Sequence, residues 1–323
     1  MSRISRYQDS VTRFIKNKSA YSDVIKASNI IDTIIKINDR SASIILLTVM
    51  NGQCKKRKIK AHHGYYIASG IDLMMTIVIL NDNIRYFKNK YDKYEIKNFI
   101  KQAPMYIIQS YMQNIDVLND VIEKDKLAKL QKKIFNFINS KLLDITKYEK
   151  INTIRKVHKT DIIKYKFSDK NLIESTYRNL NLANDDELLN YVERTYGSAC
   201  QCCFVMGWLF GTGDEKSISA LEKLGTYLGY LIKLSIDFEN LERDLKHAKY
   251  MSLNLIINLG IHKSFNLFDE NKVKLIEGCM LLGIYNITIK EVMDNIEKKF
   301  DLHLQKSDLE LISKYSSFSE VEK

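Results

Sequence analysis

The scarcity of proline and glycine limits what this chain can fold into more than any other feature of its sequence. Its 323 residues include one proline, Pro104, and 12 glycines, although 45% of its residues are hydrophobic. Proteins rich in β-structure need many turn residues, whereas long helices need few. The composition therefore predicts an all-α fold. Because no internal repeat or linker divides the chain, we expect a single domain over residues 1–323.

The spacing of apolar residues indicates where the helices lie. Residues 64–80 are apolar on nearly every side, which is typical of a central buried helix. This stretch is short for a membrane span and contains Asp72, so we expect no transmembrane segment. Residues 142–184 are rich in lysine and asparagine and are expected to form a loose insertion. Further helices are predicted over residues 19–37, 94–122, 126–143 and 185–210. Another helix is expected to start at residue 43, and one should run from residue 215 to about 247. Several shorter helices are expected within residues 254–316.

Residues 211–214 predict a turn between two helices. Gly211 and Gly213 tolerate the turn, and Asp214 can accept hydrogen bonds from the first free amides of the next helix. In that helix Gly225 and Gly229 lie four residues apart. They therefore share one face, on which a neighbouring helix can approach closely.

The chain carries a net charge of +11 at pH 7, mostly from lysine. One interpretation is a solvated, lysine-rich surface. The other is attraction to an anionic partner such as nucleic acid, a membrane surface or a diphosphate. The densest basic run, residues 55–60, has no aromatic interleaving and no nucleic-acid motif beside it.

The five cysteines are odd in number, and no secretory signal precedes them. Reduced thiols and a cytoplasmic location are the expectation. Cys200, Cys202 and Cys203 lack the paired spacing of a zinc site and lie in an apolar run. We therefore expect them to pack in the core.

Residues 203–260 carry the most specific pattern in the chain. Its elements are Met206-Gly207-Trp208, Gly211-Thr212-Gly213, Leu228-Gly229, Leu234 and Asp237. This order resembles the isoprenyl (polyprenyl) diphosphate synthases, or trans-prenyltransferases, and in particular the members encoded by large DNA viruses. The resemblance implies an isoprenoid synthase-type helical bundle around a central cavity. For a viral protein, it also implies the host cytoplasm as location.

Two aspartate-rich motifs hold magnesium in that family, and both depart from the family pattern here. The second reads Ile-Asp-Phe-Glu-Asn at residues 236–240, and the first reads Asn-Asp-Asn at residues 81–83. The resemblance makes Asp82 and Asp237 the candidate metal ligands, at helix ends on either side of one cavity mouth. Further candidate ligands are Asn81, Glu239 and Asp244.

The resemblance also implies where a diphosphate would bind. Arg194 and Thr195 match a Lys-Thr pair of the family, and Lys233 stands where a glutamine is expected. The family's Gly-Gly-Lys-x-x-Arg element falls at residues 38–43, where most cationic groups are missing. No catalytic residue is assigned, and no cofactor is expected unless the chain is active, which would require magnesium.

Four polar residues, Lys233, Asp237, Asn240 and Asp244, recur at spacings of three and four and so share one helix face. They form either an ordinary solvated face or the remnant of a cavity rim. Lys233 is expected to lean towards Asp237, one turn later, and to offset part of its charge. Asp72, inside an apolar helix, must find a polar partner, and we expect it on a neighbouring helix or a tyrosine; a catalytic role is the less favoured alternative.

Three functions are compatible with these observations. The first is a polyprenyl diphosphate synthase-like pseudoenzyme, with a structural or regulatory role as a homodimer or hetero-oligomer formed through its helices. The second is a divergent, active trans-prenyltransferase that condenses isopentenyl and allylic diphosphates. The third is a basic helical protein that binds nucleic acid or another polyanion, which a continuous basic face would favour.

Overall fold

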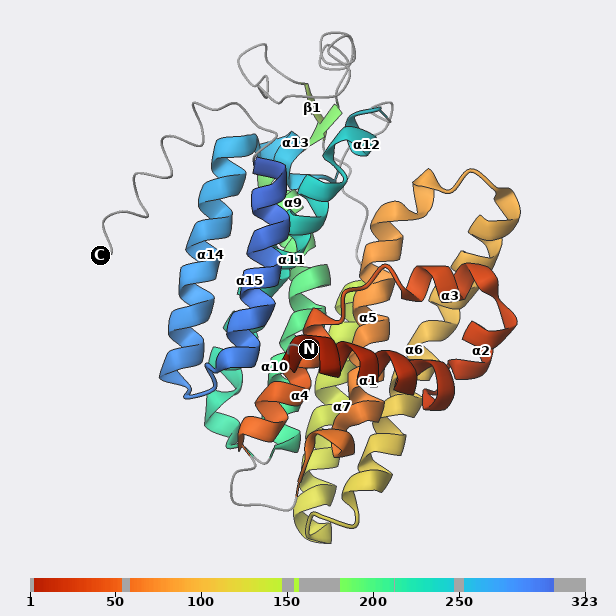
Figure 1. The fold of residues 1–323 in the computed structure, drawn as a ribbon, viewed down its shortest axis with the longest axis vertical. Coiled ribbons are helices and arrows are strands. Elements are labelled where there is room, and N and C mark those ends of the chain that lie inside the picture. Colours follow the sequence, from red (N-terminus) through yellow and green to blue (C-terminus); the bar gives the residue numbers. More distant parts are fainter. Residues whose placement is uncertain are drawn as a thin grey trace. The chain divides into compact units, whose positions relative to one another are not determined.

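The computed structural model describes residues 3–53, 59–146, 154–156, 181–211, 213–246 and 253–304. Most of these residues lie in helices (Figure 1), so the predicted all-α fold is confirmed. The basic run at 55–60 and the expected insertion at 142–184 lie mostly outside the described residues.

The α-helices are α1 (Arg3–Lys18), α2 (Ser22–Ala27), α3 (Asn29–Ile35), α4 (Ser41–Gln53), α5 (Tyr65–Asn83), α6 (Lys90–Leu118), α7 (Lys124–Thr146), α9 (Asp185–Val192), α10 (Ser198–Phe210), α11 (Ile218–Glu239), α12 (Leu241–Lys246), α13 (Leu255–Leu259), α14 (Ile261–Leu281) and α15 (Ile287–Leu304). Short 3₁₀ turns lie at Ala61–Gly64, Ile84–Tyr86 and Glu215–Ser217, and a π-helical turn lies at Glu193–Gly197. Strands β1 (Ile154–Lys156) and β2 (Asn181–Ala183) pair antiparallel, with Ile154 opposite Ala183.

The chain divides into two compact units. Unit 1 comprises Met1–Tyr148, Glu193–Gly229 and Lys274–Val292. Unit 2 comprises Glu149–Val192, Tyr230–Val273 and Met293–Lys323. The single domain expected from the sequence stays a prediction.

Helix α5 lies in the core of unit 1. Its residues 67–80 are all buried, and it packs against α1, α4, α6 and α10. The segment Ala61–Asn83 is long and apolar enough to cross a membrane by length and composition, but 83% of its apolar window is buried inside the protein. The predicted central buried helix is therefore confirmed.

Two glycines of α11 bring that helix against the segment that ends in α10. A Cβ atom added at Gly225 would lie 2.3 Å from the Cα of Gln201, and one added at Gly229 would lie 2.6 Å from the amide nitrogen of Gly197. Because no side chain fits in such a space, the backbones approach as closely as the sequence predicts.

The turn before α11 also follows its prediction. Asp214 accepts a hydrogen bond from the amide of Ser217 at 3.1 Å, as an N-cap does. The indole Nε1 of Trp208 donates to the carbonyl oxygen of Asp214 at 2.8 Å, which fixes the turn against the end of α10.

Unit 2 has an aromatic core. The ring of Phe300 stacks on Phe268, with centroids 4.0 Å apart, and meets Phe238 edge-on at 4.4 Å. The side chain of Asn258 accepts a hydrogen bond from the amide of Ala183 at 2.7 Å, which ties β2 to α13.

Three predicted helices are divided in the structure. Residues 19–37 form α2 and α3, because Ser28 takes an extended conformation and its hydroxyl caps α3. The π-helical turn interrupts residues 185–210. The helix predicted to reach residue 247 ends at Glu239, and α12 follows.

The C-terminal part follows its prediction over the described residues. Residues 254–304 contain α13, α14 and α15, each shorter than the helix predicted over residues 215–247.

Candidate functional site

Asp237 lies near the end of α11 and is 2% exposed. Its Oδ1 accepts a hydrogen bond from Lys233 Nζ at 2.8 Å, so the predicted pairing with Lys233 is confirmed. Its Oδ2 accepts a hydrogen bond from the amide of Leu255 at 2.7 Å. Both carboxylate oxygens are therefore engaged by donors of unit 2.

Asn254 links Asp237 to Asp244. Its Nδ2 donates to the Asp237 carbonyl oxygen at 2.7 Å and to Asp244 Oδ2 at 2.9 Å. Its Oδ1 caps α13 by accepting from the amides of Ile256 and Ile257. Asp244 Oδ1 also accepts from Arg243 Nη2 at 3.0 Å. The result is a connected buried network at the point where α11, α12 and α13 meet.

This network tests the first interpretation of the polar face shared by Lys233, Asp237, Asn240 and Asp244, while the remnant of a cavity rim stays a prediction. Lys233 and Asp237 are each 2% exposed, and Asp244 is 6% exposed. An ordinary solvated face would leave these side chains in water, so that interpretation is wrong for these three residues. Only Asn240 is partly exposed, and its side chain donates to the Ile236 carbonyl oxygen of its own helix.

Asp82, the other candidate metal ligand, lies at the end of α5 in unit 1. It is 9% exposed, and its Oδ2 accepts a hydrogen bond from the hydroxyl of Tyr196 at 2.8 Å. Tyr196 lies in the π-helical turn and is fully buried. Sequence analysis missed this tyrosine, since nothing local links it to a residue 114 positions away.

The remaining candidate residues differ from the two aspartates in exposure or in partner. Asn81 and Glu239 are exposed. Arg194 pairs with Asp144 at 3.0 Å, while its neighbour Thr195 is buried in the π-helical turn. Asp82, Arg194 and Thr195 belong to unit 1, whereas Asp237, Asp244 and Lys233 belong to unit 2. The expected facing of Asp82 and Asp237 across one cavity mouth stays a prediction.

The donor set around Asp237 does not fit a magnesium ion. Mg²⁺ requires about six oxygen ligands at roughly 2.0–2.1 Å in octahedral geometry. The Lys233 ammonium already occupies Oδ1, and an ion bound there would lie against that positive charge. Among the described residues, no group of three or more His, Cys, Asp or Glu side chains is arranged to hold a metal ion.

A second buried ion pair joins Arg40 to Asp72 in unit 1. Arg40 Nη1 donates to Asp72 Oδ2, and the side chains of Asn38 and Ser43 donate to Oδ1, each at 3.2 Å. Arg40 has a positive φ of 69°, which only a few non-glycine residues adopt. The polar partner expected for Asp72 therefore comes from the segment just before α4 and the first turn of α4.

Burial raises the pKa of Asp72 to about 6, and the charge of Arg40 opposes the rise. Tyr21 is also buried. Its burial and the negative charge of Asp72 raise the pKa of Tyr21 well above its ordinary value. Tyr21 is held in place because its hydroxyl donates to the Ser69 carbonyl oxygen at 3.0 Å. These groups pack α5 against its neighbours.

The described cysteines are structural. Cys200, Cys202, Cys203 and Cys279 are free and buried, as expected for the first three. Burial raises the pKa of the Cys279 thiol to about 12, and it raises those of the other three as well. Thiols that stay protonated are poor nucleophiles and poor metal ligands.

No protein-family model matches the sequence, and no curated protein matches it significantly. Solved structures match the fold. An FPP/GFPP synthase from Zymomonas mobilis aligns with a TM-score of 0.56 at 6% identity, over 92% of this chain and 98% of that one. A geranyltranstransferase from Thermotoga maritima aligns with a TM-score of 0.53 at 11% identity, over 94% and 100%. A geranyltransferase from Helicobacter pylori aligns with a TM-score of 0.54 at 14% identity, over 92% and 96%.

These matches extend over more than nine tenths of this chain and of each enzyme. At such low identity they establish architecture and not activity. The chain has the all-α fold of the isoprenoid synthases.

Proposed function

We propose that this protein keeps the prenyltransferase scaffold without its magnesium-dependent chemistry and serves a structural or regulatory role. The observation that carries the proposal is the engagement of Asp237. A metal-binding aspartate must turn its oxygens towards the ion, but Asp237 directs one oxygen to Lys233 and the other to the Leu255 amide. In this position the carboxylate stabilises the junction between α11 and α13.

The residue types at the expected motif positions support the proposal. Asn81, Ile236 and Asn240 stand where the resemblance to the synthases places aspartates. Each replacement removes a negative charge that would balance magnesium and diphosphate. Arg40, the cation retained between residues 38 and 43, is buried against Asp72 instead of being available to a diphosphate.

The test is a prenyl-transfer assay. The purified protein is incubated with magnesium, radiolabelled isopentenyl diphosphate and an allylic diphosphate, and the products are extracted and chromatographed. The Thermotoga maritima geranyltranstransferase serves as the positive control. We expect no product above that of a protein-free reaction.

Turnover would contradict the proposal only if it depends on the candidate residues. The variants to compare are Asp82→Asn, which can still accept the Tyr196 hydrogen bond, and the double variant Lys233→Met/Asp237→Asn, which removes a buried pair together. Product formation that both variants abolish, at an unchanged melting temperature, would favour a divergent active trans-prenyltransferase.

A partner-binding role is supported by helix α6. Met105 and Met112 are 59% and 44% exposed, and Tyr91 is 71% exposed. These residues lie at intervals of seven or fourteen positions, so they share one face of α6. We propose that this face takes part in a homodimer or a hetero-oligomer.

Light scattering coupled to size-exclusion chromatography tests the association. A Met105→Glu/Met112→Glu variant should shift a wild-type dimer towards monomer. A monomeric wild type at high micromolar concentration would rule out the homodimer and leave the heterologous partner. A dimer that the variant leaves intact would exclude this face.

A further inference from the structure

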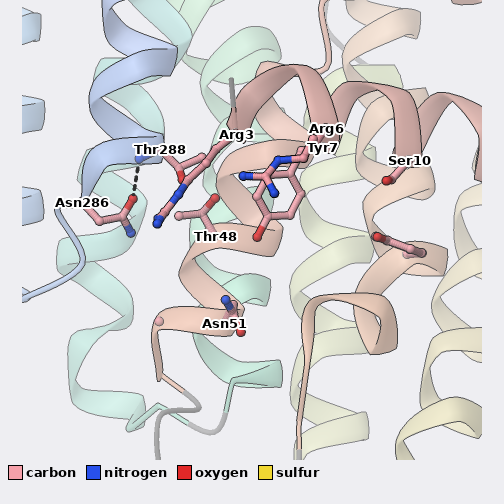
Figure 2. Close-up of a pocket in the computed structure, with 10 residues that line it drawn as sticks. Arg3, Arg6, Tyr7, Ser10, Thr48, Asn51, Asn286 and Thr288 are labelled. Carbon is pink, nitrogen blue, oxygen red and sulfur yellow. Dashed lines mark hydrogen bonds between the residues drawn. The ribbon is translucent and has the colours of Figure 1, made fainter. Parts of the chain in front are cut away.

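Unit 1 contains a cavity of about 630 Å³ that belongs to none of the candidate residues above. Four segments line it: α1, the end of α4, the start of α5 and the residues that begin α15 (Figure 2). The lining residues are Arg3, Arg6, Tyr7, Ser10, Thr48, Asn51, Gly52, Tyr65, Asn286 and Thr288. None of them is acidic, and two are arginines.

The two arginines reach the cavity from one face of α1. Arg3 and Arg6 lie three residues apart, and Tyr7 and Ser10 continue the same face at spacings of four and seven. Figure 2 shows both guanidinium groups extending from α1 towards the space beside Thr48. Within the described part of the chain, neither arginine forms an ion pair.

The pKa of Tyr7 reflects the nearness of Arg3 and Arg6. Burial and the neighbouring Tyr65 raise the pKa of Tyr7, while Arg3 and Arg6 lower it. The two cations therefore act on a phenol that lines the same cavity. The cavity thus combines two guanidinium groups with a phenol that stays protonated and can donate a hydrogen bond.

The acidic residues Glu291 and Asp9 lie near the cavity in the fold or in the sequence, but neither of them lines it. Glu291 of α15 accepts a hydrogen bond from the amide of Ile4 at 3.3 Å, which joins the start of α1 to α15. Asp9 of α1 is exposed and does not line the cavity. Asn286 accepts hydrogen bonds from the amides of Thr288 and Ile289 and so fixes the wall that α15 contributes.

We propose that this cavity binds a phosphate-bearing small molecule, with the phosphate group between Arg3 and Arg6. A guanidinium group presents five N–H donors in a fork that matches phosphate oxygens. Hydroxyl groups of Tyr7 and Ser10 supply further donors on the same face of α1. The volume lies in the range of small-molecule sites, roughly 300–1,000 Å³, so the cavity can hold more than the phosphate itself.

The cavity and Asp82 lie near opposite ends of α5. The cavity lies beside the C-terminal end of α4 and the first residue of α5, whereas Asp82 is close to the last residue of α5. A helix of 19 residues is about 28 Å long at 1.5 Å per residue. Whether the chain transfers prenyl groups therefore leaves this prediction unchanged.

Isothermal titration calorimetry at low ionic strength tests the proposal. The probes are inorganic phosphate, inorganic diphosphate, a nucleoside monophosphate, and vesicles of phosphatidylcholine with or without phosphatidic acid. The variant Arg3→Gln/Arg6→Gln removes both guanidinium groups. The matched control Arg13→Gln/Lys18→Gln removes two exposed charges of α1 that do not line the cavity.

We expect a saturable 1:1 isotherm for at least one soluble phosphate probe. The Arg3/Arg6 variant should weaken binding at least about tenfold, because two charge-assisted contacts are lost, and the control should bind like the wild type. Binding of vesicles only, with the same sensitivity to Arg3 and Arg6, would assign the phosphate to a lipid headgroup.

Two results would overturn the proposal. One is the absence of binding to every probe at millimolar concentration. The other is equal weakening in both double variants, since that would assign the binding to the overall positive charge. Melting temperatures of both variants check that α1 remains folded.

Discussion

At the scale of single residues, four buried charged side chains of the described chain form two ion pairs. Lys233 faces Asp237 in unit 2, and Arg40 faces Asp72 in unit 1. Each pair is almost completely buried. A buried pair adds little net stability relative to apolar residues, but removing one partner leaves an uncompensated charge. Such positions therefore tolerate single substitutions poorly.

Lys233→Met should lower the free energy of unfolding by about 3–5 kcal/mol, because Asp237 is left buried without its cation. The double variant Lys233→Met/Asp237→Asn removes both charges and should recover most of this loss. Urea denaturation followed by circular dichroism measures both changes. A single variant that loses less than about 1 kcal/mol would show that water reaches Asp237.

Asp72 should make stability depend on pH. Its pKa in the folded protein is about 6, above the ordinary value of 3.8. Between these values the folded state binds the proton more strongly than the unfolded state. The contribution of Asp72 is therefore fully present below about pH 4 and is lost as the pH rises through about 6.

The comparison with Asp72→Asn isolates this effect, since the other titrating groups are shared. The free energy of unfolding of the wild type minus that of the variant should fall between pH 4 and pH 6. A difference that stays constant or rises over this range would contradict the raised pKa.

The residue scale also shows what sequence can reveal. The contact of Lys233 with Asp237 was predictable because i and i+4 positions on a helix are neighbours. The role of Arg40 was not, because its contact with Asp72 spans 32 residues and depends on how α4 packs on α5. The sequence indicated only that a carboxylate in an apolar helix needs a partner.

At the scale of elements, apolar spacing predicted the long helices but not their interruptions. The breaks at Ser28, at the π-helical turn and after Glu239 depend on a single cap or on local packing. An apolar pattern continues across such breaks unchanged, so it cannot reveal them. Glycine spacing was more informative, since Gly225 and Gly229 mark a real close approach.

Gly225→Ala should destabilise the protein by about 1–3 kcal/mol or more, since the new methyl group would meet the backbone of Gln201 at 2.3 Å. The matched control is Gly52→Ala in α4, where an added Cβ has no neighbour within 4 Å. The control should be neutral, or more stable by up to about 1 kcal/mol. Thermal and urea unfolding measure both variants. Equal changes in the free energy of unfolding for Gly225→Ala and Gly52→Ala would contradict this prediction. They would mean that α10 and α11 can move apart with little loss of stability.

At the scale of the whole molecule, proline scarcity and a few motifs indicated the isoprenoid synthase-type architecture, which the structural matches establish at 6–14% identity. Architecture is readable at this distance because it depends on many apolar positions, each of which tolerates substitution. Chemistry depends on a few oxygens in fixed geometry. It is therefore decided by residues such as Asp237, whose hydrogen bond from the Leu255 amide only a structure reveals.

The last prediction concerns folding of the whole chain. Three of the five boundaries between the two units fall inside α11, α14 and α15, so each of these helices contributes residues to both. Independent domains are usually joined by exposed linkers, and a helix resists interruption because its hydrogen bonds form cooperatively. We therefore expect one calorimetric transition whose enthalpy equals the van't Hoff enthalpy. Two separated transitions, or a protease-resistant fragment that retains only unit 1, would contradict the single domain predicted from the sequence.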